Sequence, residues 1–200
     1  MGASVVAVVV LAGCGGDDAN GNAANGSSSA APSVIALSGS SGAAFNSVDI
    51  AFATDMIPHH RQAVEMAEIA EPRASSPAVK DLAVRIRIAQ DPEIETMSGW
   101  LRHWGQAVPS ASSRGDHGAH GGGGSGMMSE QEMQQFIASS GTNFDRTFLE
   151  LMIRHHQGAI DMATTEQRQG VNRQAKQFAA KIAADQAAEI AEMQDLLVTL

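Results

Sequence analysis

Two pairs of adjacent histidines are the residues in this sequence best suited to chemistry. His59 and His60 form the first pair, and His155 and His156 form the second. Methionines lie one and two helical turns away from each pair along the chain. Imidazole is a common ligand for copper, zinc and nickel, and thioether favours Cu(I), so these residue types indicate a metal site.

Helical periodicity determines which side chains point inward together. At about 100° per residue, Met56, His59 and Met66 share the inward stripe of one helix, and His60 lies on its shoulder. Glu93 shares the inward face of the following helix with Gln90, and the second half of the chain repeats both patterns. The predicted metal ligands are Met56, His59, His60, Met66, Glu93, Met97, Met152, His155, His156, Met162, Glu189 and Met193.

A purely structural role for these inward polar residues is the alternative. Burying His, Glu and Gln costs free energy unless each is hydrogen-bonded or binds a ligand. A network that joins His59 to Glu93 and His155 to Glu189 would satisfy them and fix the helix register. The chain would then be a structural, pH-responsive or protein-interaction bundle.

Copper is the metal that the ligand types favour, and zinc is a second candidate. A site built from Met and His suits the space outside the cytoplasm, where free thiols tend to oxidise. A di-iron oxidase would need a Glu-x-x-His on each of two helices. The sequence contains none, since Glu150 is followed three residues later by Ile153. We therefore expect binding rather than catalysis, in copper buffering, transfer or resistance.

An internal repeat organises the chain from about residue 45 onward. A constant shift of 96 positions, from Asp49 to Asp145, aligns two long segments without a gap. Both histidine pairs, their flanking methionines and the later Gln-x-x-Glu-Ile strings match at that shift. The domain is therefore two copies of one helix-helix unit, over about residues 45–104 and 141–200.

Capping signals predict the helices of both units. The expected elements are a helix from Asn46 to Glu71, one capped by Ser76 that runs to Gln106, a short one opened by Ser129-x-x-Glu132, one from Thr142 or Asn143 to just before Gly170, and one capped by Asn172. Two hairpins plus a short connecting helix predict an all-α four-helix bundle over residues 43–200. The Gly-rich residues 105–128, which include His117 and His120, are predicted to be a flexible connector.

One mismatch distinguishes the two units. Pro58 directly precedes the first histidine pair, and in mid-helix it removes a hydrogen bond and bends the helix. Arg154 occupies the equivalent position of the second unit. The geometry of the two sites should therefore differ.

The N-terminal segment predicts export and attachment to a membrane. An apolar run from Val5 to Leu11 leads into Leu11-Ala12-Gly13-Cys14, which resembles a bacterial lipobox with Cys14 as the lipidated residue. Residues 1–14 are then a lipoprotein signal peptide. Residues 15–42, rich in Gly, Ser, Ala and Asn, are then a disordered tether. The predicted location is the bacterial cell envelope, on the outer side of the cell membrane.

The charge balance argues against a nucleic-acid partner. The chain has 13 Lys and Arg against 22 Asp and Glu, a formal net charge of −9, whereas nucleic-acid binding needs basic clusters. The expected partners are a metal ion and, through the lipid, the membrane. A second copy of the chain and a protein that receives the metal remain open.

The histidine segments resemble the DUF305 family. The strings that carry the resemblance are Asp55-Met56-Ile57-Pro58-His59-His60, Met152-Ile153-Arg154-His155-His156, Gln90-x-x-Glu93-Ile94 and Gln186-x-x-Glu189-Ile190. The resemblance covers roughly residues 45–200. It implies a ferritin-like bundle that is exported or lipid-anchored, and some members are linked to copper binding and resistance. By the same resemblance, the site residues are the four histidines with Met56, Met66, Met152 and Met162, and Arg154 departs from the family pattern.

Overall fold

The computed structural model describes residues 44–110 and 126–200, and all the regular structure in those ranges is helical. The elements are α1 (Ser47–Arg73), α2 (Pro77–His103), α3 (Glu130–Ala138), α4 (Gly141–Gln169) and α5 (Arg173–Thr199). The predicted all-α bundle of two helical hairpins and a short connecting helix is confirmed. The predicted signal peptide with Cys14, the tether, and His117 and His120 lie outside the described residues.

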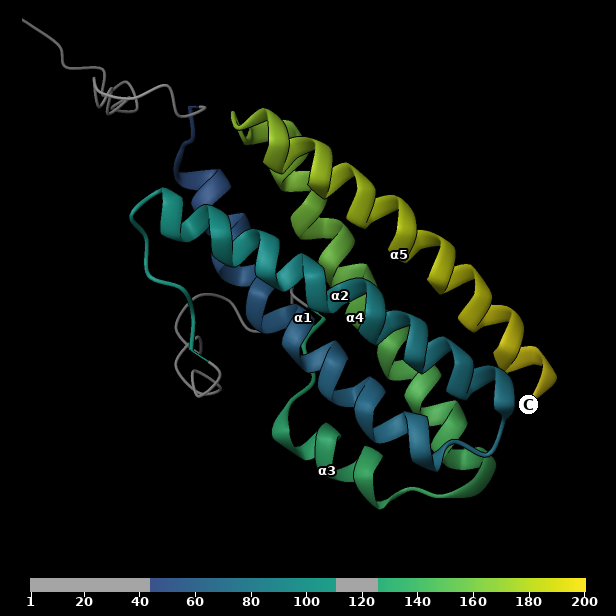
Figure 1. The fold of residues 1–200 in the computed structure, drawn as a ribbon. Coiled ribbons are helices and arrows are strands. Elements are labelled where there is room, and N and C mark those ends of the chain that lie inside the picture. The colour runs from purple at the N-terminus through teal and green to yellow at the C-terminus, as the bar shows by residue number, and fades with distance from the viewer. Residues whose placement is uncertain (1–43, 111–125) are drawn as a thin grey trace, which may run out of the picture. The chain divides into compact units, whose positions relative to one another are not determined.

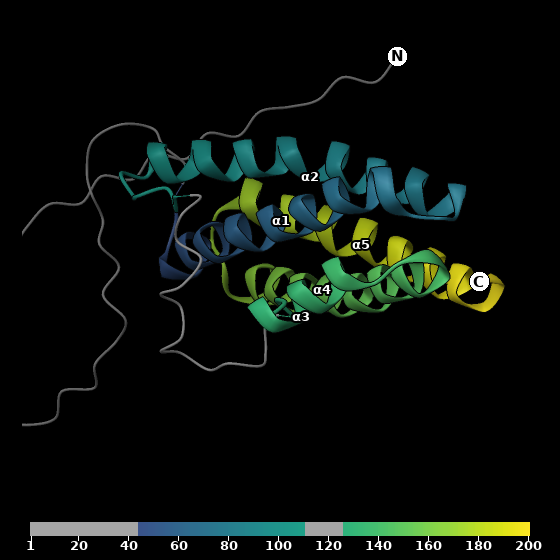
Figure 2. The same cartoon turned by 90° about the horizontal axis from the view of Figure 1, so that it is seen from below.

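The two hairpins meet through their first helices. α1 packs against α2, α4 packs against α5, and α1 and α4 pack against each other at the centre. The outer helices α2 and α5 meet mainly through long side chains, such as Trp100 with Phe178 and Arg85 with Glu192 (Figures 1 and 2). Each of α1 and α4 therefore has two buried faces, one toward its own hairpin partner and one toward the other repeat.

The helix boundaries follow the predicted capping residues closely. Asn46 and Ser129 each form a capping box, and the side chain of Asn172 accepts hydrogen bonds from Gln174 N and Ala175 N. Ser76 stands at the predicted cap of α2, but its side chain makes no capping hydrogen bond. Ser76 is thus the N-cap residue by position, as predicted, but its side chain does not take part in capping.

Two buried aspartates cap helices of the opposite repeat. Asp145 of α4 accepts from Ser75 N (2.8 Å) and Ser76 N (2.7 Å), just before α2. Its repeat equivalent, Asp49 of α1, accepts from Val171 N (3.2 Å) and Asn172 N (2.8 Å), just before α5. A carboxylate at a helix N-terminus satisfies free N–H groups and interacts favourably with the helix dipole. The exchange fixes how the two hairpins are placed against each other.

A polar layer divides the apolar core into two clusters. One cluster contains Met66 and Ile86 with Phe148 and Met152, and the other contains Met56 and the apolar residues beyond it on each long helix. Between them lie the buried histidines of α1 and α4 and the inward polar residues of α2 and α5. Burial of apolar surface on both sides stabilises the bundle and excludes water from this layer.

The last residues of the predicted flexible connector are packed on the bundle. Met128 is buried, and its backbone N–H and C=O bond to the Gln62 side chain at 2.6 and 2.9 Å. Gly126 has φ of 69°, and a Cβ there would lie 2.4 Å from the carbonyl oxygen of Arg154. Only glycine fits this approach. The connector prediction was therefore wrong for residues 126–128, where close contacts with α1 and α4 hold the chain.

No helix in the described part of the chain is both long enough and apolar enough to cross a membrane.

A buried carboxyl group without a basic partner lies where α4 ends. Glu166 is fully buried beside Asp49, and a Cβ on Gly170 would lie 2.3 Å from its Oε1. The other repeat has Ala70 at the position of Glu166. Burial, and then the neighbouring Asp49 carboxylate, raise the pKa of Glu166 to about 8, while Lys176 opposes the rise. The protonated carboxyl can donate to Asp49, which explains how two acids share this site.

Glu166 should therefore make the stability of the bundle fall as the pH rises. Its stabilising contribution is fully present below pH 4.5 and is lost as the pH rises toward about 8, because the unfolded chain releases the proton first. In Glu166→Gln, the free energy of unfolding should fall less across that pH range than in the wild type, by at least about 1 kcal/mol. Urea unfolding at several pH values measures this. Glu150→Gln, at an exposed position of the same helix, is the control. Equal pH slopes in the two variants would contradict the assignment.

Candidate metal centre

The first histidine of each pair lies at the centre of the bundle, where the two rings contact each other. His59 of α1 and His155 of α4 lie with their ring centroids 3.7 Å apart and their planes at 35°. Both residues are buried, as predicted for His59. They face each other because each lies on the side of its helix that packs against the other repeat. The structure thus joins the two predicted clusters into one central layer.

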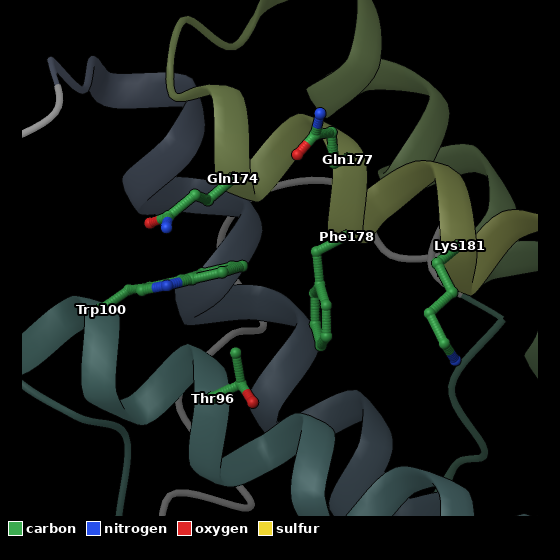
Figure 3. Close-up of a pocket in the computed structure, with 6 residues that line it drawn as sticks. All are labelled: Thr96, Trp100, Gln174, Gln177, Phe178 and Lys181. Atoms are coloured by element: carbon green, nitrogen blue, oxygen red, sulfur yellow. The ribbon is translucent and has the colours of Figure 1, made fainter.

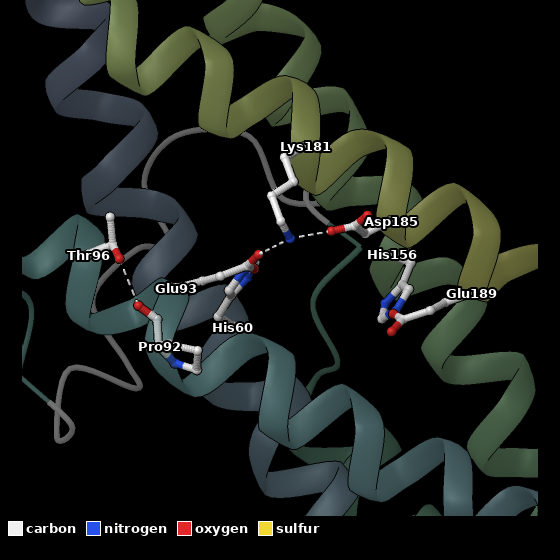
Figure 4. A network of polar contacts seen from close by, with 8 residues as sticks. All are labelled: His60, Pro92, Glu93, Thr96, His156, Lys181, Asp185 and Glu189. Carbon is white, nitrogen blue, oxygen red and sulfur yellow. Dashed lines mark hydrogen bonds and ion pairs between the residues drawn. The ribbon is translucent and has the colours of Figure 1, made fainter.

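The second histidines of the pairs bind the glutamates. His60 Nε2 donates to Glu93 Oε2 at 2.8 Å, and His156 Nε2 donates to Glu189 Oε2 at 2.6 Å (Figure 4). The predicted network of His59 with Glu93 and His155 with Glu189 was therefore wrong, as was the shoulder position of His60, which is fully buried. Adjacent residues differ by about 100° around a helix, so His59 faces α4 while His60 faces α2.

The methionines are divided differently from the predicted grouping by repeat. Met56 and Met97 share one apolar cluster with partly buried Met162 of the other repeat. Their repeat equivalents, Met152 and Met193, share the other cluster with Met66. Of the six predicted methionine ligands, each cluster thus takes two from one repeat and one from the other. The cause is the antiparallel packing of α1 on α4, which places the end of one helix beside the start of the other.

Several polar atoms of the central layer have no hydrogen-bond partner among the described residues. These atoms include both ring nitrogens of His155 and the Nδ1 atoms of His60 and His156. They also include the amide nitrogen and oxygen of Gln90 and the amide oxygen of Gln186. Each such buried atom costs roughly 1–3 kcal/mol. Desolvation, and then the neighbouring His59, lower the pKa of His155 well below its usual value, which keeps this imidazole neutral.

The layer offers metal-binding atoms, but they do not converge as the structure stands. When Nε2 of a neutral imidazole donates to a carboxylate, its lone pair lies on Nδ1. In that tautomer, Nδ1 of His60 or of His156 could bind a metal. Within residues 44–110 and 126–200, however, no group of three or more His, Cys, Asp or Glu is arranged to hold a metal ion. Binding would require the central rings to move apart.

The Pro58 and Arg154 mismatch has a structural consequence on the side of α4. The Arg154 guanidinium donates to Glu132 Oε1 at 2.5 Å and contacts Met128 Sδ at 3.0 Å. It thereby holds the start of α3 beside the second histidine pair. Pro58 offers no such donor, while α1 remains a single helix through it. The expected difference between the two sites is thus a difference in what covers them.

The sequence and fold together match a known family. The profile described as a domain of unknown function, DUF305, matches residues 49–197. The chain belongs to the DUF305 family. No curated protein matches it.

Solved DUF305 structures share this fold. A putative secreted DUF305 protein from Streptomyces coelicolor is 32% identical, with a TM-score of 0.68 over 76% of this chain and 91% of that one. A DUF305 fragment from Deinococcus radiodurans is 30% identical, with a TM-score of 0.68 over 78% and 98%. CopM in its Cu(II)-bound form is 32% identical, with a TM-score of 0.65 over 76% and 96%.

Several residues that shape this DUF305 domain were missed from the sequence. Asp49 and Asp145 were noted only as repeat matches, although an aspartate repeated at an inward position signals a cap. Glu166 could have been found from its mismatch with Ala70. The repeat-equivalent cations Arg85 and Lys181, on α2 and α5, gave no sequence signal, because a charged helix face is usually only solvated.

Two ring substitutions should separate the paired from the unpaired histidines. His155→Phe removes two nitrogens that lack partners, so stability should change by no more than about 1 kcal/mol or should rise. His60→Phe leaves the Glu93 carboxylate without its imidazole donor and should cost about 2 kcal/mol or more. Urea unfolding at neutral pH measures both. A loss for His155→Phe as large as that for His60→Phe would show that its nitrogens are satisfied in the native protein.

Proposed function

We propose that this DUF305 protein is an exported, lipid-anchored copper-binding protein of the cell envelope, which buffers copper or passes it to a partner. The ligands come from the central layer and the methionines beside it. They are Met56, His59, His60, Met66, Glu93, Met97, Met152, His155, His156, Met162, Glu189 and Met193.

The observation that carries the proposal is the state of the imidazoles in the layer. In each repeat a carboxylate holds one ring nitrogen, and the other ring nitrogen is buried without a partner. Carboxylate, imidazole and metal in series is a common arrangement in metalloproteins, since the carboxylate fixes the tautomer and raises the basicity of the ligand. A bound metal would also satisfy atoms that otherwise cost stability.

The kinds of donor fit copper better than harder metals. Thioethers from both apolar clusters flank the layer and favour Cu(I), while imidazole suits Cu(II) and Zn(II) as well. Bound copper would supply the soft acceptor for these atoms. The protein's own part is to keep His155 neutral, to orient His60 and His156 through Glu93 and Glu189, and to exclude water.

The solved relatives support the same function. CopM has been solved in Cu(II)-bound and Cu(I)-bound forms, and it is 32% and 31% identical in them. The Streptomyces coelicolor relative is described as a putative secreted protein. These statements concern those proteins, and they motivate the assignment of copper and of an extracytoplasmic location to this chain.

A structural bundle is the second candidate function, and one observation favours it. The two His–Glu pairs are already complete hydrogen bonds, and no three His, Cys, Asp or Glu residues of the described segments converge on a metal position. In that case the layer would serve to fix the register of the four long helices. Copper binding separates the two candidates.

Copper affinity should fall when the carboxylates are neutralised. Glu93→Gln with Glu189→Gln keeps the shape of both side chains but lowers the basicity of the imidazoles, which should weaken copper binding by about 10–100-fold. His59→Ala with His155→Ala should weaken it at least as much. Titration of the metal-free protein with Cu(I), Cu(II) and Zn(II) measures the affinities, and circular dichroism verifies folding.

His103→Ala is the matched control, because His103 is exposed at the end of α2 and lies away from the layer. The copper affinity of His103→Ala should equal that of the wild type. Equal, weak binding by the wild type and both double variants would instead support the structural bundle.

Membrane attachment should depend on Cys14. Cys14→Ser removes the thiol that would receive the lipid, so the protein should move from the membrane fraction to the soluble extracytoplasmic fraction of a bacterial host. Fractionation with immunodetection measures this. Unchanged attachment would exclude the lipobox interpretation, while leaving the metal assignment untouched.

A further inference from the structure

Among the described residues of the central layer, the two glutamates are the most exposed. The side chains of His60 and His156 are fully buried, whereas those of Glu93 and Glu189 are 11% and 19% exposed. Glu93 lies on α2 and Glu189 lies on α5. A cation that arrives from solvent therefore meets Glu93 or Glu189 before any imidazole.

Lys181 of α5 already occupies the approach to Glu93. Its Nζ lies 3.6 Å from Glu93 Oε1, while the other oxygen of that carboxylate binds His60. Asp185, one turn further along α5, holds the same ammonium group at 2.5 Å. Figure 4 shows the ammonium lying between the two carboxylates. The cation thus comes from the second repeat and covers the opening of the first.

Arg85 of α2 is the repeat equivalent of Lys181 and has the reciprocal position. Its guanidinium donates to Glu192 of α5. That bond is the main cause that raises the pKa of Arg85, and the Glu189 carboxylate contributes as well. Arg85 therefore reaches the carboxylate one turn beyond Glu189 on α5, whereas Lys181 contacts Glu93 itself.

A surface hollow of about 420 Å³ lies beside the Glu93 opening. Residues of α2 and α5 line it, namely Thr96, Trp100, Gln174, Gln177, Phe178 and Lys181 (Figure 3). Lys181 is the only charged residue among them, and it also contacts Glu93. Solvent cations that enter this hollow therefore meet a positive charge before the carboxylate.

We propose that Lys181 and Arg85 are electrostatic gates of the central layer. Lys181 covers the Glu93 opening directly, and Arg85 acts on the Glu189 opening from one turn away, through its pair with Glu192. The inference rests on the proposed copper site, and it adds what controls entry to that site. Metal entry at Glu93 must displace Lys181 from that carboxylate. Since both cations are solvent-exposed, salt should weaken the gates.

Stopped-flow mixing of the full metal-free chain with Cu(II) tests the gates. Quenching of fluorescence from Trp100, which lines the hollow, reports arrival of the ion. Lys181→Gln should raise the association rate about 10-fold at low ionic strength, and the gain should shrink as salt is added. Arg85→Gln should act in the same direction through the other opening. Lys181→Arg, which keeps the charge, should retain the slow rate.

Lys80→Gln is the matched control, because it removes one positive charge from α2 about 20 Å from Glu93 along the helix axis. A rate increase in this variant as large as that in Lys181→Gln would overturn the proposal, since only net charge would then matter. An unchanged rate in Lys181→Gln would overturn it as well.

A metal-free measurement separates failure of the gates from failure of the copper site. In urea unfolding, Lys181→Gln and Glu93→Gln together should cost less stability than the sum of the two single substitutions. If the wild type binds no copper, the proposed function fails. The non-additivity of the two stability losses then decides whether Lys181 interacts with Glu93, and strictly additive losses would overturn the gate.

Discussion

The contact between His59 and His155 is the constraint on which the rest of the bundle depends. Two imidazole rings from two repeats lie 3.7 Å apart in a layer from which apolar clusters on both sides exclude water. That contact fixes the position along each helix at which α1 packs against α4. This position in turn determines which histidine reaches a glutamate and which methionines share an apolar cluster.

The fold tolerates this polar layer because hydrogen bonds and apolar packing together offset the free-energy cost of burying it. Glu93 and Glu189 satisfy one nitrogen each of His60 and His156, and the large apolar clusters offset the atoms that remain without partners. A core of this kind contains buried polar atoms that are free to bind a ligand. The same property that lowers the stability of the free protein would favour a ligand that completes the layer.

The sequence predicted the architecture because periodicity, capping residues and the internal repeat all indicated the same helices. It predicted the inward histidines for the same reason. It could not predict that His60, not His59, pairs with Glu93, because one helix with two buried neighbours has two inward faces. Nor could it show that Asp145 caps the helix that follows Ser76, since that contact joins residues far apart in the chain.

The exchange of caps between Asp49 and Asp145 bears on how such a chain arose. A single hairpin of this type would lack both the carboxylate at the start of its second helix and the ring that faces its own histidine. Two identical hairpins placed antiparallel would supply each other with both. The duplicated chain therefore holds, within one polypeptide, the kind of reciprocal interface that two identical hairpins could form as a homodimer, and Glu166 and Arg154 mark where its two halves differ.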